Sequence, residues 1–596
     1  MGLPFPFLVG LMVLFAHREL LPAIPGSGDA DRLALFGLLL AVPALLAGSS
    51  LLLIRRQLTS GRRSQAPPRA LLRLSAVATP VVLWVLLGDG GYAACIDAWS
   101  GSSHFADMAL LLLPLLVAEI PRIVIGTATM LCCEIDDEIA GARLVPAAML
   151  PGVADVVPVA RLRLGWPILV TMPCVLLGVS LDVLQIDRGL YVFCLGTSLG
   201  STLGTIAFLC VASVVLPYWF RFAFGTDRRL PEPVGGKLRE TAAALGFDPA
   251  RVLLLPTGMR AMNAMMVGPL PAGRCLCLTD GLLRALDSES LAGVVAHEVG
   301  HARRGHPRLL MALVVIVPLL LTNPLRLLDL DAIDVSWQAL VAVIAIVVGW
   351  TMVRTLAHRF EHEADAVSVG LLGAAPCTRA LMVVSRLAMP LRHGLMGRAL
   401  SLHPEERRRW DLMRRYEGDP EFRAGFEATG RRLRLGILAT VAVALLAATA
   451  MWVADWRYET VVWHLHSGDV AAARQLLTGI DEVPVRWQKT WPLLTQEVAA
   501  AAELAPEATN WASARAALEQ RAWRRGVEVL LASGPAAARA WFSLAVEAEP
   551  SPSDLQRAVY DYCAAAATHD PERMEEVRAA VRRLGFPAEL SPVFGS

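Results

Sequence analysis

The sequence predicts a mainly α fold, that of a polytopic helical membrane protein with a small α+β domain and an α-helical C-terminal domain. Hydrophobic residues make up 55% of the 596 residues and the mean hydropathy is +0.49, both above the values usual for soluble globular proteins. Eight stretches approach or reach the roughly 20 apolar residues that a membrane-spanning helix requires. Between residues 218 and 307 this pattern gives way to turn residues and short apolar runs, which are typical of an α+β domain.

The apolar stretches divide the chain into four regions. A further apolar stretch, 3–16, is short and has no basic flank before it, so it fits a cleaved signal peptide poorly, and the sequence leaves open whether it forms a ninth, partial span. The predicted spans are 33–54, 74–88, 107–128, 165–184, 190–217, 308–324, 338–356 and 434–453. The expected regions are an N-terminal membrane region with five or six spans (1–217), a domain that includes two spans (218–433), a last span (434–453) and a helical C-terminal domain (454–596).

The arginines of the short loops predict the orientation, because Lys and Arg are retained on the cytoplasmic side. Six arginines lie between residues 55 and 73, whereas residues 89–106 contain neither Lys nor Arg. Alternation along the chain then places 218–307 and 357–433 in the cytoplasm and 454–596 outside.

Almost all the basic residues are Arg, which is typical of a GC-rich, bacterial genome, so the expected location is the bacterial inner membrane. The formal net charge of +1 gives no reason to expect a nucleic-acid partner. The lipid bilayer is the expected surrounding of the spans.

Within 218–307, residues 251–255 and 274–279 are predicted strands and residues 288–304 a predicted helix. This helix carries the motif His297-Glu298-Val299-Gly300-His301. Two His residues at positions i and i+4 project from one face, so both imidazoles can reach one zinc ion, while the intervening Glu298 can reach a zinc-bound water. The motif therefore predicts one Zn²⁺ per chain, held by His297 and His301.

A second predicted helix carries Glu361-His362-Glu363-Ala364-Asp365 after two spans that return the chain to the same side. A catalytic zinc needs a third protein ligand, and a carboxylate from another helix would supply it. Glu361 and Asp365 share a helix face, so one can bind the metal while the other orients a ligand His. Glu363 lies near the opposite side and is expected to face solvent or a basic neighbour.

Other charged residues near these helices have a simpler interpretation. His306 follows His301 by five residues, a helical turn of about 500° that points it away from the shared face. It is interpreted, with His358, His362 and His393, as a surface or interfacial histidine. The run Arg407–Arg409 is interpreted as solvated and facing lipid headgroups.

Several motifs occur in the order seen in a known family, the HtpX-like and CAAX-prenyl-protease group of integral-membrane zinc endopeptidases. The resemblance covers about 230–415. Two departures are the His that follows Glu361, where the family has an aromatic or apolar residue, and the additional tail. The similar segments are Asn263-Ala264, Leu278–Leu283, Leu291–His301, Arg359–Asp365 and Ser401–Pro404 followed by Glu406 and Arg407.

The resemblance implies a zincin-like α+β catalytic domain with Glu298 as catalytic base and Glu361 as the third metal ligand. Asp365 would then orient a ligand, and His403 would contact the site or the developing oxyanion. Asn263 and Ala264 would begin an edge strand, 263–268, on which an extended peptide docks.

The implied activity is zinc-dependent hydrolysis of peptide bonds in membrane or membrane-associated proteins, in quality control or processing. Two other functions compete with it. An inactive scaffold or sensor of the same fold would have no need for Glu298, and a transporter with a chance motif would need functional polar groups in its spans, where only Glu119 and Arg122 stand out.

Overall fold

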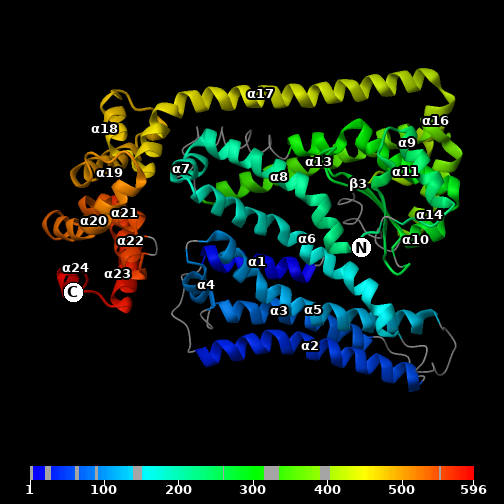
Figure 1. The fold of residues 1–596 in the computed structure, drawn as a ribbon, viewed down its shortest axis with the longest axis horizontal. Helices are drawn as coiled ribbons and strands as arrows, with labels where there is room; N and C mark the ends of the chain where they lie inside the picture. Colours follow the sequence, from blue (N-terminus) through cyan, green and yellow to red (C-terminus); the bar gives the residue numbers. More distant parts are fainter. Residues whose placement is uncertain are drawn as a thin grey trace.

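The protein was analysed as a computed structural model. It describes residues 5–20, 29–60, 66–87, 92–101, 103–138, 151–227, 229–259, 261–313, 335–388, 403–549 and 552–595. The described chain is that of a mainly α, polytopic membrane protein with one small sheet (Figure 1), as the sequence predicts.

The N-terminal region is a bundle of long apolar helices. Helix α2 packs against α3 and α5, α5 packs against α6, and α6 against α8. Leu83, Leu86, Leu111 and Leu115 are fully or almost fully buried between these helices. The helices are α1 (Phe5–Leu20), α2 (Asp29–Ser60), α3 (Ala66–Leu87), α4 (Tyr92–Ser100), α5 (His104–Glu138), α6 (Val153–Gln185), α7 (Arg188–Gly196) and α8 (Ser198–Phe224).

Six described helices are long and apolar enough to cross a membrane, and each overlaps a predicted span. They include α2, α3, α5, α6 and α8 of the bundle and the much longer α17 (Pro420–Ser467), which contains the predicted last span. Predicted span 338–356 lies within α13 (Val335–Leu372). Most of predicted span 308–324 lies outside the described residues.

Predicted span 190–217 is not one continuous helix, which is a correction. Helix α7 ends at Gly196 and α8 begins at Ser198, with Thr197 between them in an extended conformation. The Thr197 hydroxyl accepts a hydrogen bond from the N–H of Gly200, which caps the new helix. Local capping therefore interrupts an apolar run that hydrophobicity alone presents as continuous.

The α+β domain contains a three-stranded sheet in the order β1-β3-β2. Strand β1 (Val252–Leu255) is parallel to β3 (Cys275–Thr279), and β2 (Ala264–Val267) is antiparallel to it. These strands and α11 (Ser288–Arg304) confirm the predicted elements, and β2 lies at an edge of the sheet. The remaining elements are α9 (Val234–Ala244), the 3-10 turn η2 (Pro249–Arg251) and α10 (Asp280–Ala285).

Helix α11 packs against α9, β2, α13 and α14 (Ala374–Ala388), so the core of this domain surrounds the predicted motif. Leu291, Val295 and Val299 of α11 are buried against Leu276 and Leu278 of β3. The apolar face of α11 thus fixes the helix on the sheet, and its other face is left for polar side chains.

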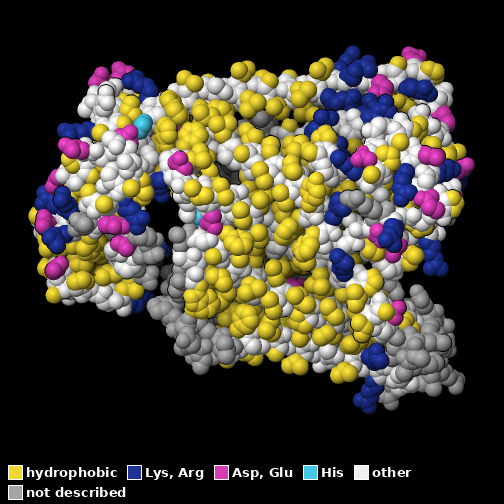
Figure 2. Space-filling model, viewed as in Figure 1, with side chains coloured by type: hydrophobic (Ala, Val, Ile, Leu, Met, Phe, Trp, Pro, Cys, Tyr) yellow, Lys and Arg dark blue, Asp and Glu magenta, His cyan; other side chains and the backbone are white. Residues whose placement is uncertain are grey.

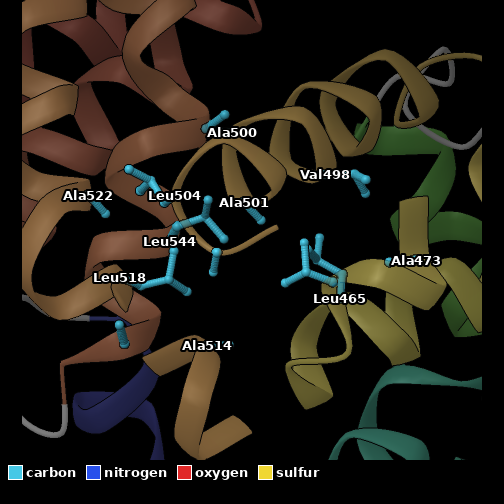
Figure 3. Close-up of a cluster of buried hydrophobic side chains, with 14 of the residues drawn as sticks. Leu465, Ala473, Val498, Ala500, Ala501, Leu504, Ala514, Leu518, Ala522 and Leu544 are labelled. Atoms are coloured by element: carbon cyan, nitrogen blue, oxygen red, sulfur yellow. The ribbon is translucent and has the colours of Figure 1, made fainter. Parts of the chain in front are cut away.

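A single 48-residue helix, α17, follows α16 (Glu406–Gly418) and runs along the molecule from the α+β domain to the tail (Figure 1). The tail is helical, as predicted, and its core is formed by residues such as Leu504, Leu518 and Leu544 (Figure 3). Its elements are α18 (Val470–Thr478), η5 (Val485–Trp487), α19 (Trp491–Leu504), α20 (Trp511–Ser533), α21 (Pro535–Ala548), α22 (Asp554–Ala567), α23 (Pro571–Leu584), η6 (Ala588–Leu590) and α24 (Ser591–Phe594).

Hydrophobic side chains cover the middle of the face shown in Figure 2, whereas charged side chains gather at its two ends. One end holds the α+β domain with α16, and the other holds the tail. The α+β domain and the tail therefore lie on opposite sides of an apolar belt.

Candidate metal centre

Small residues bring the two motif helices together. A Cβ atom on Gly300 of α11 would lie 3.2 Å from the Cα atom of Ala364 on α13, so glycine allows this close approach. Helix α11 begins at the N-cap Asp287, whose side chain accepts from the N–H groups of Glu289 and Ser290. It ends at Gly305, which adopts the left-handed conformation. The crossing places the two motifs face to face.

The crossing gathers three side chains that could hold one metal ion, those of His297, His301 and Glu361. The two Nε2 atoms of His297 and His301 lie 3.3 Å apart. Glu361 Oε2 lies 3.7 Å from His297 Nε2, and Glu361 Oε1 lies 3.6 Å from His301 Nε2.

This donor set fits a zinc ion. Two nitrogens that bind one tetrahedral zinc at 2.0–2.1 Å are about 3.3–3.4 Å apart, which matches the separation of the two imidazoles. Two imidazoles and a carboxylate form a three-ligand set that leaves one position open, the pattern of catalytic zinc sites. Burial and the neighbouring His297 lower the pKa of His301 to about 3, so its imidazole is neutral, the form that binds metal.

His297 is supported by a buried carboxylate. Its Nδ1 atom lies 2.9 Å from Asp365 Oδ1, within ion-pair distance. Arg409 donates two hydrogen bonds to Asp365, of 2.8 and 2.7 Å. Burial alone would raise the pKa of Asp365, but Arg409 and His297 outweigh it and hold the pKa near 2. An ionised carboxylate therefore faces the far side of this imidazole.

Glu361 is also ionised. Its Oε2 atom lies 3.1 Å from His403 Nδ1 and 3.2 Å from Arg409 Nη1. Burial opposes ionisation, but His403, His297 and Arg409 outweigh it and hold the pKa of Glu361 well below its usual range. His403, which is half exposed, thus contacts the carboxylate of the metal-binding cluster.

His301 has a different supporting group. Its Nδ1 atom lies 3.0 Å from His306 Nδ1, and His306 Nε2 lies 3.2 Å from Glu363 Oε2. Both supporting residues are buried, with His306 at 1% and Glu363 at 2% exposure. Arg434 of α17 donates a 2.6 Å hydrogen bond to Glu363 Oε2, and Arg359 donates one of 3.2 Å to Oε1.

Glu298 lies beside the cluster and is partly buried. Burial is the main cause that raises its pKa, to about 7, and the nearby Glu361 carboxylate adds to it. The main-chain N–H of Met266 acts in the opposite direction by donating to the carboxylate. A carboxylate with a pKa near 7 is suited to proton transfer at neutral pH.

The edge strand β2 runs past Glu298. Thr279 N–H donates to the carbonyl of Asn263, which makes these two residues a hydrogen-bonded pair of the antiparallel ladder. Alternation then points the main-chain groups of Ala264 and Met266 away from β3, toward the open edge. Asn263 has its main chain bonded to Thr279, while its side chain is exposed.

Of three predictions about neighbouring residues, two are wrong, wholly or in part, and the third is confirmed in one of its two alternatives. His306 is buried rather than at the surface, because Gly305 ends α11 and the turn brings His306 back to His301. Glu363 does not face solvent but the basic residues Arg359 and Arg434, the second of its two expected surroundings. Within the predicted solvated run, Arg409 is buried against Asp365, whereas Arg407 and Arg408 are exposed.

The comparisons with known proteins agree with the arrangement of this domain. Residues 233–417 match the sequence pattern of Peptidase family M48. The matched region begins just before α9 and ends in α16, so it contains the sheet, both motif helices and Arg409.

Curated relatives named "Protease HtpX homolog" match parts of the chain. The relative from Aeropyrum pernix is 30% identical over 143 residues, which cover 23% of this chain and 43% of the relative. The relative from Pyrococcus furiosus is 32% identical over 91 residues, 15% of this chain and 30% of the relative. The chain thus spans less than half the length of these relatives. Together with the helices that can span a membrane, these matches identify the chain as an integral-membrane protein with a domain similar to Peptidase family M48 and to the HtpX homologues.

Proposed function

We propose that this chain is a membrane-embedded, zinc-dependent endopeptidase that hydrolyses peptide bonds of membrane or membrane-associated proteins, in their quality control or processing. The observation that carries the proposal is the cluster of His297, His301 and Glu361 with Glu298 and an open strand edge beside it. A metal-binding triad, a base and a docking edge are the parts that peptide hydrolysis requires.

In this mechanism His297, His301 and Glu361 would hold the zinc ion. When bound, zinc would act as a Lewis acid and lower the pKa of water from 15.7 to about 7. Glu298 takes the proton of the attacking water and transfers it to the leaving amine. Asp365 and Arg409 hold the ring of His297, and His403 fixes the carboxylate of Glu361.

The test uses the full-length chain in detergent. It measures the zinc content of the chain and its cleavage of an unfolded protein such as casein. One zinc per chain with cleavage, both lost when a chelator removes the metal, is the expected result. Zinc without cleavage would favour the inactive scaffold, and the absence of both zinc and cleavage would favour the transporter.

Arg122 and Glu119, the polar pair of α5, are bonded to each other, which agrees with a structural role.

We infer that an extended substrate pairs with the outer edge of β2 through the main chain of Ala264 and the carbonyl of Met266, whose N–H is bonded to Glu298, and that Asn263 contacts it through its side chain. The position of the strand supports a membrane source for the substrate. Strand β2 packs against the spanning helix α8, and Gly268 at its end lies against Pro217 of that helix. A segment that leaves the bilayer beside α8 would therefore meet this edge.

Substitution Ala264→Pro tests the edge, because it removes an outward-facing N–H and leaves the ladder to β3 intact. The loss of one hydrogen bond of about 1 kcal/mol is expected to lower kcat/KM for peptide substrates about fivefold. Zinc content should not change. Unchanged kcat/KM in a folded, zinc-containing variant would exclude Ala264 from substrate docking.

We propose that the catalytic domain is cytoplasmic and that the tail is extracytoplasmic in a bacterial inner membrane. The positions of the two parts on opposite sides of the apolar belt support this orientation, as do the arginines of the short loops. Reporters fused after Arg304 and after Arg432 are expected to lie in the cytoplasm, and a reporter fused after Trp456 is expected to lie outside it. The same reading from all three fusions would contradict the orientation.

A further inference from the structure

We propose that His306 and Glu363 form a positioning pair for the zinc ligand His301, with Arg434 of the last spanning helix holding the pair in place. This inference rests on the proposed metallopeptidase function. It assigns a role to two buried polar residues that contact neither the substrate edge nor Glu298.

The chemistry of the two imidazoles gives the contacts a direction. A neutral imidazole that binds metal through Nε2 carries its proton on Nδ1, so His301 Nδ1–H donates to His306 Nδ1, 3.0 Å away. His306 must then accept at Nδ1 and carry its own proton on Nε2, which donates to Glu363 Oε2 at 3.2 Å. The chain of hydrogen bonds thus runs outward from the metal to a carboxylate, the arrangement that fixes ligand orientation.

The surroundings hold His306 in one orientation. Its ring stacks on Phe360, with the centroids 4.3 Å apart and the planes at 10°. Gly305 before it adopts the left-handed conformation that turns the chain back toward α13. The stacked ring and the turn at Gly305 together hold His306 with its Nδ1 atom toward His301.

Helix α17 closes the other side of Glu363. Arg434 and Arg359 donate to its two oxygens. A Cβ atom on Gly430 of α17 would lie 2.6 Å from Glu363 Oε1, so the backbone of α17 packs directly against the carboxylate. The last spanning helix is therefore part of the support of the metal centre, although it lies some 70 residues from the motif on α13 in sequence.

His297 and His301 are thus supported independently. Asp365 and Arg409 act on His297, and His306 and Glu363 act on His301. Loss of such a supporting contact weakens metal binding about 10–100-fold, whereas loss of an ordinary buried ion pair elsewhere in the domain should not.

Three substitutions of His306 separate positioning from packing. His306→Asn keeps an acceptor near the place of Nδ1, His306→Gln keeps a donor near the place of Nε2, and His306→Phe keeps only the stacking ring. The control is Glu427→Gln, which weakens the partly buried pair of Arg304 and Glu427 on the same helix as Arg434.

The experiment measures zinc affinity of each full-length variant by competition with a chelator, and unfolding temperature without metal. We expect His306→Phe and His306→Gln to bind zinc about 10–100-fold more weakly than wild type. His306→Asn keeps the acceptor for His301 but loses the contact with Glu363, so its affinity should lie between theirs and that of wild type, and Glu427→Gln should stay close to wild type. Wild-type affinity in His306→Phe would overturn the inference. If His306→Phe does not fold, equal affinities of His306→Asn and His306→Gln would overturn it. Absence of zinc binding in the wild type would instead reject the proposed function.

Discussion

Replacing Glu298 by Gln is expected to leave zinc bound and to lower peptide hydrolysis by about 10²–10⁴-fold, the usual contribution of a positioned general base. The three metal-binding side chains are unchanged, and the amide oxygen of Gln can still accept from the N–H of Met266. What the amide cannot do is take a proton from water. The measurement pairs zinc content with cleavage of an unfolded protein.

Glu289→Gln is the matched control, because Glu289 lies on the same helix but is exposed and paired with Arg379. Its variant should cleave at the wild-type rate. Substantial turnover by Glu298→Gln would remove Glu298 from the mechanism. Loss of zinc from that variant would show that Glu298 supports the metal centre rather than proton transfer.

The sequence predicts the central residues of the candidate site because their positions depend only on short spacings within single helices. The spacing of His297 and His301 is one helical turn, and the same spacing relates Glu361 to Asp365, so a helix is enough to place each pair on one face. The apolar lengths predict the spans for a similar reason, since a spanning helix needs only its own residues to satisfy its backbone.

The surroundings of the ligands could not be predicted in this way. Arg409 reaches Asp365 from a helix 44 residues away in sequence, and Arg434 reaches Glu363 from 71 residues away, so only tertiary packing brings them together. For His306, by contrast, a local rule gave the wrong position. The helical rotation of about 500° would place it on another face, but α11 ends before it. The glycine at 305 was the available signal, because it commonly marks a helix C-terminus.

Substitution of Glu361 on α13 tests the proposed third metal ligand. Glu361→Ala is expected to lower zinc content far below one ion per chain and to abolish hydrolysis, since two imidazoles alone leave the ion short of a protein ligand. The fold should persist, because Arg409 keeps its two hydrogen bonds to Asp365. His362→Ala, the adjacent residue of α13, is the control and should retain zinc.

Glu363→Ala distinguishes a ligand from a supporting residue on the same helix. Glu363 is buried and bonded to His306, so its loss should weaken zinc binding about 10–100-fold while stoichiometric binding is still reached at high zinc. Added zinc should not restore zinc binding or hydrolysis in Glu361→Ala, because this variant lacks a proposed metal ligand. Zinc content measured at increasing free zinc separates the two cases. Full occupancy in Glu361→Ala, with loss in Glu363→Ala at every concentration, would mean that Glu363 is the ligand and that the carboxylate facing both imidazoles is not.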